Sequence, residues 1–176
     1  MMKMNNILVI IPTYNEIENI SKIINAIFNT DLSIDVLIVD DLSPDGTGEE
    51  VRKLMKIFSN SLFLETKLEK QGLGAAYVHG FRWALKRKYD YVFEMDADFS
   101  HQPMELKSMI KILDSEADVV VGSRYVNGVN VVNWPLSRIL LSYFASLYVQ
   151  IITSMPIKDA TAGFVGYKMS VLKTIN

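Results

Sequence analysis

The sequence predicts an α/β fold with a mainly parallel sheet. Short apolar runs alternate along the chain with segments of helical periodicity, and within each run the residues are continuously apolar. This order favours strand–helix–strand units, because parallel strands need a crossover and the crossover helices then cover both faces of the sheet. No linker, repeat or low-complexity stretch interrupts the pattern. We therefore expect one domain over residues 1–176.

Each element follows from a local pattern. Apolar runs of strand length predict strands over 7–11, 36–39, 62–64, 91–95 and 119–121. Helices are expected from a capping box of Asn15 and Glu18 to about Phe28, over 47–58, over 75–87, and from Pro103 to about Asp114. The chain ends just after an apparent helix start, so we expect it to be part of a longer protein.

Composition excludes several kinds of site and partner. Hydrophobic residues make up 49% of the chain and the net charge is −2, so no basic footprint for nucleic acid is present. The absence of cysteine excludes disulfides and thiolate metal sites. Residues 7–11 are too short for a signal-peptide core. Residues 139–152 are too short and too polar for a membrane span, and a buried helix or one at a membrane surface fits them better.

Polar residues follow three of the predicted strands. Pro12-Thr13-Tyr14, Asp40-Asp41 and Asp96-Ala97-Asp98 each come directly after an apolar run. In open α/β sheets ligands bind outside the carboxyl ends of the strands, so these residues should meet at one edge.

The last of these segments predicts a metal site. Side chains two apart on an extended chain face the same way, so Asp96 and Asp98 should project together while Ala97 faces away. Paired carboxylates suit magnesium or manganese, which share their ligand shell with phosphate. For an isolated Asp-x-Asp, a solvated acidic turn is the alternative.

Several motifs resemble, in order, those of family-2 glycosyltransferases with the GT-A fold. They are Ile-Pro-Thr-Tyr-Asn-Glu (11–16), Val-Asp-Asp-Leu-Ser-Pro-Asp-Gly-Thr (39–47), Gly-Leu-Gly-Ala-Ala-Tyr (72–77), Met-Asp-Ala-Asp-Phe-Ser-His (95–101) and Gly-Ser-Arg-Tyr (122–125). Asn133-Trp134-Pro135 with Arg138, and Asp-Ala-Thr-Ala-Gly-Phe (159–164), narrow the resemblance to the polyprenol-phosphate (dolichol-phosphate) mannosyltransferases.

Two features depart from that resemblance. Leu42 stands where the family usually has a polar residue, commonly Asn. The family's catalytic domain also continues for some tens of residues, so the C-terminal part is expected to be missing here. The resemblance implies a three-layer α/β/α architecture with a Rossmann-like, mainly parallel sheet.

The resemblance also implies a nucleoside site. Pro12, Tyr14 and Glu16 correspond to the family's grip on the nucleoside, with Tyr14 offering a stacking face. A charge at a helix N-terminus is the alternative role for Glu16. Val39 and Asp41 correspond to positions that line the base pocket. Asp40 should then point elsewhere and hold the neighbouring loop.

The metal and phosphate contacts follow in the same way. Asp98 is expected to be the direct metal ligand. Asp96 is the second choice, with contact to ribose or sugar as its alternative. The Ala97 backbone and the Ser100 side chain lie close enough to contribute, although Ser100 also fits a helix cap before Pro103.

Basic residues complete the expected site. Arg124 is expected to make a forked contact to the donor phosphates, with a surface arginine as the alternative. Arg138 shares a helical face with Trp134 and is assigned to the acceptor phosphate. His79 and His101 are expected to pack or support loops, because an ionised phosphate acceptor needs no strong base.

The implied activity is inverting, metal-dependent transfer of mannose from GDP-mannose to a polyprenyl or dolichyl monophosphate. Arg124, Asp96 and Asp98 are the expected catalytic residues. The expected location is peripheral, at the cytoplasmic face of a membrane, with residues 139–152 near lipid. The alternatives are another donor, such as UDP-glucose, and a nucleotide-binding subunit without catalysis.

Overall fold

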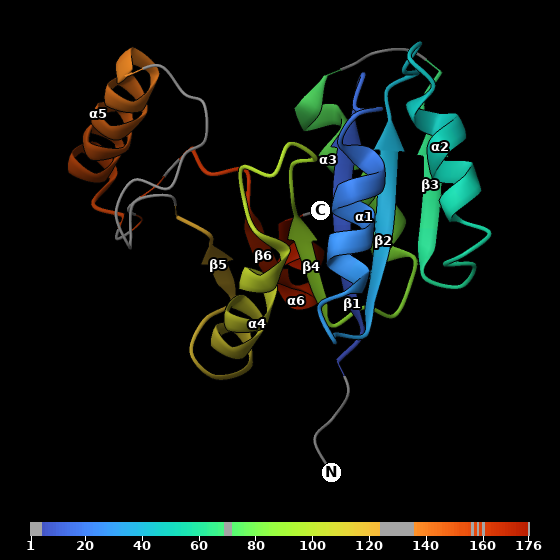
Figure 1. Ribbon diagram of the computed structural model, residues 1–176. Helices are drawn as coiled ribbons and strands as arrows, with labels where there is room; N and C mark the ends of the chain where they lie inside the picture. The colour runs from blue at the N-terminus through green and yellow to red at the C-terminus, as the bar shows by residue number, and fades with distance from the viewer. Residues whose placement is uncertain are drawn as a thin grey trace.

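A computed structural model describes residues 5–68, 72–123, 136–155, 157, 159 and 161–175. These residues form a six-stranded sheet flanked by helices (Figure 1). In chain order the elements are β1 (Ile7–Thr13), α1 (Ile20–Phe28), β2 (Ile34–Asp40), α2 (Thr47–Leu54), β3 (Leu62–Thr66), α3 (Leu73–Leu85), β4 (Tyr91–Glu94), the 3₁₀ helix η1 (Pro103–Glu105), α4 (Leu106–Ser115), β5 (Val119–Val121), α5 (Leu136–Thr153), β6 (Val165–Lys168) and α6 (Met169–Ile175). The predicted α/β class is confirmed.

The sheet has the strand order β3-β2-β1-β4-β6-β5. β1 pairs in parallel with β2 and β4, and β2 in parallel with β3. β6 runs antiparallel to both of its neighbours, β4 and β5. The four parallel strands therefore end at the same edge, where ligands bind in open α/β sheets. The parallel part of the sheet was predicted, whereas β6 was not.

Helices cover both faces of the sheet (Figure 1). The apolar residues of α1, α2 and α4 pack in one core cluster, and those of α3 and α6 pack in a second cluster on the opposite face. β1 serves both clusters, since Val9 and Ile11 belong to the first and Leu8 and Ile10 to the second. All four are fully buried, and each contributes about 1.5–3 kcal/mol. Burial on both faces explains why these runs are continuously apolar.

The helix after β1 begins later than predicted. α1 begins at Ile20, and its N-cap residue, Asn19, makes no capping hydrogen bond through its side chain. Asn15 has a φ of 61°, and its N–H donates to Ser43 Oγ at 3.0 Å. The predicted capping box of Asn15 and Glu18 is therefore wrong. Its residues belong to a loop held by the turn after β2.

Other boundaries differ at helix ends. α2 ends at Leu54 rather than at residue 58, and turns follow it. Pro103 begins η1, which leads into α4, so the expected helix over 103–114 has a 3₁₀ first turn. These shifts leave the order of elements unchanged.

α5 exposes most of its apolar side chains and lies to one side of the three layers (Figure 1). Leu141, Tyr148 and Ile151 are 73%, 66% and 70% exposed. Residues 139–152 were expected to form either a buried helix or a helix at a membrane surface. Because most apolar side chains of α5 that the structure describes are exposed, the buried helix is wrong. Among the residues that the structure describes, no helix has the length and apolarity that crossing a bilayer requires.

Candidate active site

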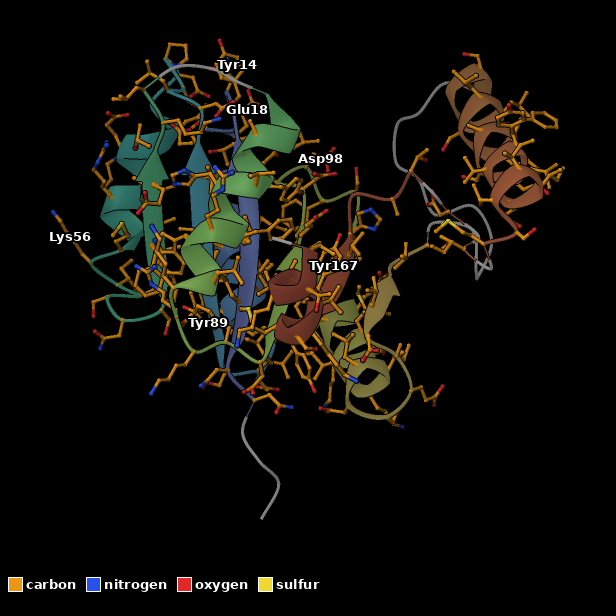
Figure 2. All side chains as sticks on the ribbon, turned by 180° about the vertical axis from the view of Figure 1, so that it is seen from behind. Tyr14, Glu18, Lys56, Tyr89, Asp98 and Tyr167 are labelled. Atoms are coloured by element: carbon orange, nitrogen blue, oxygen red, sulfur yellow. The ribbon has the colours of Figure 1, made fainter. Side chains whose placement is uncertain are left out.

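A cavity of about 340 Å³ lies at the carboxyl ends of the parallel strands. We call it the first cavity. Its walls come from the ends of β1, β2 and β4 and from the start of α3. The predicted site residues among its walls are Pro12, Tyr14, Glu16, Asp41, Asp96, Ala97 and Asp98. Figure 2 shows Tyr14 and Asp98 at this edge and Tyr89 toward the opposite edge.

A second cavity, of about 440 Å³, adjoins the first. Its walls include Ser100 and His101 after β4, Leu141 and Ser142 of α5, and Thr161 and Gly163 before β6. Asp96 and Asp98 line both cavities. The carboxylate pair therefore forms part of the wall between the two cavities.

Val39 does not line the first cavity. Its side chain is fully buried in the cluster under α3, together with Leu37 and Ala76. The Val39 side chain is therefore not exposed to contact a base, although such a contact was expected.

Asp40 points away from the cavity and holds the neighbouring loop, as predicted. Its Oδ1 accepts hydrogen bonds from Thr13 Oγ1 (2.9 Å) and Ser43 Oγ (2.6 Å), and its Oδ2 accepts one from the Ser43 N–H (3.0 Å). Asp40 is only 2% exposed, so these bonds compensate for burying its charge.

Asp41 faces the cavity and pairs with a residue that sequence reasoning missed. Lys67, just after β3, places its Nζ 3.1 Å from Asp41 Oδ1, and both side chains are less than 10% exposed. The Gly72 N–H donates to Asp41 Oδ2 at 3.0 Å. Because the ion pair is buried, removing either partner would leave a costly unpaired charge. No local pattern in the sequence marks Lys67, since the pairing depends on β3 lying beside β2.

The Ser-Pro-Asp-Gly-Thr turn after β2 holds the loop that carries Tyr14 and Glu16. Three side chains of the turn accept hydrogen bonds from three consecutive backbone N–H groups of that loop. The pairs are Asn15 N–H to Ser43 Oγ, Glu16 N–H to Thr47 Oγ1 and Ile17 N–H to Asp45 Oδ2, each 3.0 Å long. The turn thus fixes one wall of the first cavity.

Leu42 precedes this turn with a φ of 57° and a side chain that is 56% exposed. Asn populates this left-handed region several-fold more readily than branched or bulky residues do. The departure from the family pattern at Leu42 therefore falls on a residue in a strained backbone conformation.

The Asp96 carboxylate is held from two sides. Tyr77 of α3 donates its hydroxyl to Asp96 Oδ1 at 3.3 Å. Gly163 lies on the other side, where a Cβ would stand 2.5 Å from Asp96 Oδ2. Burial, followed by the charges of Asp96 and Glu94, raises the pKa of Tyr77 well above its ordinary range. The hydroxyl therefore keeps its proton and acts as the donor.

The Asp98 side chain stabilises a turn in the loop that follows it. Its Oδ1 accepts the Ser100 N–H at 2.9 Å, and Phe99 between them has a φ of 59°. Ser100 lines the second cavity beside the two aspartates. It does not cap the following helix, because the N-cap residue of η1 is Gln102. The alternative role for Ser100 as a helix cap is therefore wrong.

A further carboxylate, Glu94, lies two residues before Asp96 and was not singled out from the sequence. Tyr167 of β6 donates its hydroxyl to Glu94 Oε1 at 3.1 Å. Burial raises the pKa of Glu94 to about 7, the hydrogen bond from Tyr167 opposes the rise, and the Asp96 charge adds to it. The sequence shows Glu94 only as the polar end of a strand.

Each of the two histidines contacts a neighbouring side chain. His79 Nε2 lies 3.2 Å from Glu65 Oε2, and the same carboxylate accepts from Trp83. His101 is buried, and its ring centroid lies 5.1 Å from that of Phe164 beneath the second cavity.

The predicted phosphate contacts lie outside the described residues. The structure does not describe Arg124 or the Asn133-Trp134-Pro135 segment. It also does not describe the side chain of Arg138. Within the described ranges, no group of three or more His, Asp or Glu side chains gathers as a metal site. Asp96 and Asp98, with Ser100 beside them, still offer the hard oxygen donors that magnesium and manganese prefer.

Comparison with known proteins gives the family. The sequence profile described as "Glycosyl transferase family 2" matches residues 8–175. The chain belongs to glycosyltransferase family 2. It is 43% identical over 169 residues to polyprenol monophosphomannose synthase of Mycolicibacterium smegmatis, covering 96% of this chain and 64% of the relative. It is also 43% identical over 170 residues to undecaprenyl-phosphate mannosyltransferase of Micrococcus luteus, covering 97% and 69%. The chain thus spans about two thirds of the length of these family-2 relatives.

The fold agrees with that assignment. The mannosyltransferase PcManGT from Pyrobaculum calidifontis, solved in complex with GDP-Man and Mn²⁺, superposes with a TM-score of 0.70 at 21% identity. The match covers 99% of this chain and 48% of PcManGT. The predicted GT-A fold of this family-2 chain is thereby confirmed, together with the resemblance to polyprenol-phosphate mannosyltransferases.

Proposed function

We propose that this chain forms the catalytic part of an inverting, metal-dependent mannosyltransferase. The donor is GDP-mannose, and the acceptor is a polyprenyl or dolichyl monophosphate. The observation that carries the proposal is the carboxylate pair shared by two cavities, since a transferase must bring a donor and an acceptor to one reacting centre. The names of the two relatives and the GDP-Man and Mn²⁺ bound to PcManGT support the choice of substrates.

The first cavity holds the donor in this proposal. Tyr14 stacks on the nucleoside, Glu16 and Asp41 accept its hydrogen bonds, and Pro12 shapes the wall. Asp41 is already fixed by Lys67 and Gly72, so little conformational entropy is lost on binding. A carboxylate suits guanine, whose N1–H and 2-amino group are neighbouring donors.

Asp98 and Asp96, with Ser100, hold a divalent cation at the shared wall. When bound, this cation supplies positive charge that stabilises the departing nucleoside diphosphate. Arg124 contacts the same phosphates.

The second cavity holds the acceptor phosphate. At neutral pH a phosphate monoester is already ionised, so its oxygen attacks the anomeric carbon without a general base. Attack from the face opposite the diphosphate inverts the anomeric centre and yields a β-linked lipid-phosphate mannose. Arg138, on α5, is assigned to this phosphate. Leu141 and Ser142 of α5 line the same cavity, so the apolar tail of the acceptor would lie near that helix. We place the enzyme peripherally at the cytoplasmic face of a membrane.

The decisive experiment measures transfer of labelled mannose from GDP-mannose to a polyprenyl phosphate with added Mn²⁺. The chain should transfer label, and Asp98→Ala should abolish both transfer and its dependence on metal. The matched control is Asp118→Ala, which removes an exposed carboxylate paired with Lys168 and should leave transfer unchanged. Equal turnover in both variants would remove Asp98 from the mechanism.

Thermal-shift titration separates the rival donors. GDP with Mn²⁺ should raise the melting temperature more than UDP with Mn²⁺, because at equal concentration the ligand with the lower Kd stabilises the fold more. A larger shift with UDP would defeat the choice of GDP. A shift with GDP but no transfer in any preparation would favour a nucleotide-binding subunit without catalysis.

A further inference from the structure

We propose that Tyr77 and Gly163 are positioning residues that hold the Asp96 carboxylate in one orientation at the wall between the two cavities. The inference rests on the proposed function, in which that carboxylate helps to hold the metal. It adds two residues, from α3 and from the segment before β6, to the groups on which catalysis depends.

Asp96 lacks the support that a strand would give it. β4 ends at Glu94, so Asp96 stands two residues beyond the last paired residue. A side chain on irregular backbone can occupy several rotamers, and fixing it on ligand binding costs entropy. Sites that work well hold such groups in place beforehand with neighbouring contacts.

Tyr77 supplies one of these contacts from a rigid place. It lies in the second turn of α3 and is 7% exposed, and its hydroxyl reaches Asp96 Oδ1. Its ring stacks against Phe81 with centroids 6.4 Å apart, and Phe81 in turn meets Tyr167 edge-on at 5.7 Å. The hydroxyl therefore cannot leave Asp96 without disturbing a packed aromatic group.

Gly163 leaves room for the other carboxylate oxygen, Oδ2, because it has no side chain. A Cβ at this position would lie 2.5 Å from Asp96 Oδ2, closer than real Cβ atoms come, and 3.2 Å from its Cγ, which is a tight contact. Any larger residue would push the carboxylate off its present position. Tyr77 thus binds one oxygen of the Asp96 carboxylate, and Gly163 leaves the space that the other oxygen occupies.

The neighbouring carboxylate, Glu94, has a phenol partner of its own. It stands two residues before Asp96 in the chain. The hydroxyl of Tyr167 engages Glu94, while that of Tyr77 engages Asp96. Each carboxylate thus has its own phenol donor.

The test is Mn²⁺ affinity, measured by electron paramagnetic resonance of free Mn²⁺ in the presence of saturating GDP. Tyr77→Phe keeps the ring and removes only the hydroxyl, and it should weaken Mn²⁺ binding about tenfold, the loss expected for one hydrogen bond to a charged group. Gly163→Ala should weaken it at least as much. In an Asp96→Asn chain, titrated to higher Mn²⁺, Tyr77→Phe should cause no further loss, because Tyr77 acts through Asp96.

Matched controls separate positioning from general stability. Tyr91→Phe removes a phenol that donates to Asp114 at 2.6 Å, away from both cavities. Gly48→Ala adds a Cβ whose nearest neighbours stand at an ordinary 3.6 Å. Both should alter the melting temperature more than the Mn²⁺ affinity, whereas Tyr77→Phe should do the reverse.

The outcomes distinguish this inference from the function beneath it. An unsubstituted chain that binds no Mn²⁺ with GDP would overturn the proposed function and this inference with it. A chain that binds Mn²⁺ equally well with and without the Tyr77 hydroxyl would overturn the inference alone. The inference would also be overturned if Tyr77→Phe weakened Mn²⁺ binding about tenfold in the Asp96→Asn chain as well.

Discussion

Asp45 joins the turn after β2 to the loop after β1. Its Oδ1 accepts from the Thr47 N–H (3.0 Å) and Oγ1 (2.6 Å), and its Oδ2 accepts from the Ile17 N–H (3.0 Å). Burial acts to raise the pKa of Asp45, but the hydrogen bonds from Thr47 and Ile17 outweigh it and lower the pKa below the ordinary 3.8. A lowered folded-state pKa stabilises the fold at pH above 3.8, and this contribution is lost as the pH falls through the folded-state value.

Asp45→Asn should therefore destabilise the protein in a pH-dependent way. The amide nitrogen that replaces Oδ2 cannot accept from Ile17, and losing one hydrogen bond costs about 0.5–1.5 kcal/mol near neutral pH. The difference in unfolding free energy from the unsubstituted chain should shrink once the pH falls below 3.8. Urea unfolding at several pH values measures it, with Glu49→Gln as a surface control. A difference that stays constant with pH would contradict the role of the Asp45 charge.

Sequence reasoning at this scale succeeded where a side chain's direction follows from local spacing. The alternation along β2 sends Asp40 toward the loop and Asp41 toward the cavity, because neighbouring residues on a strand face opposite sides. It failed for Lys67 and Glu94, since their partners come from strands and helices that are distant in the chain. Asp96 and Asp98 were singled out because they stand together at a strand end, and both line the two cavities.

β6 is packed tightly between its two neighbouring strands. It lies between β4 and β5, and Gly166 faces Phe93 and Val120 across them. A Cβ at Gly166 would stand 2.3 Å from Phe93 Cε1 and 2.9 Å from Val120 Cγ1. The strand can occupy this place only because Gly166 has no side chain.

Gly166→Ala should lower the unfolding free energy by about 1–3 kcal/mol, the usual cost of overpacking a core. Chemical denaturation with circular dichroism measures the loss. Gly74→Ala is the matched control, because no atom lies within 4 Å of the Cβ it would add and alanine favours helix. Equal stability of the two variants would show that β6 tolerates a side chain there.

Elements with strong local patterns were predicted and weak ones were not. β1, β2 and β4 are apolar runs between clear turns, so their positions were predicted to within a few residues. β6 is short and contains a glycine, and its pairing depends on β4 and β5 rather than on its own pattern. The start of α1 was placed too early, because the local signal of Asn15 and Glu18 was overridden by hydrogen bonds from the turn at residues 43–47.

At the scale of the whole molecule, α5 stands apart from the layered core while lining the second cavity. Its exposed apolar residues recur at helical spacing, among them Leu141, Phe144, Tyr148 and Ile151. An apolar helix surface beside the cavity assigned to a lipid phosphate suits a helix that lies in the membrane interface. From the sequence alone, this segment fitted either a buried helix or a helix at a membrane surface. Its composition does not show whether other parts of the protein pack over it.

Joint substitution of Leu141, Phe144 and Tyr148 by serine should reduce binding of the chain to lipid vesicles at least tenfold. Burying a single large apolar side chain is worth about 1.5–3 kcal/mol, so loss of three exceeds one factor of ten. Co-sedimentation with vesicles of phosphatidylcholine and phosphatidylglycerol measures the partition coefficient. Ile57→Ser is the control, since Ile57 is 71% exposed just after α2 and lines neither cavity. If the triple variant and the control partition alike, α5 does not carry the membrane contact, and the acceptor must reach the second cavity by another route.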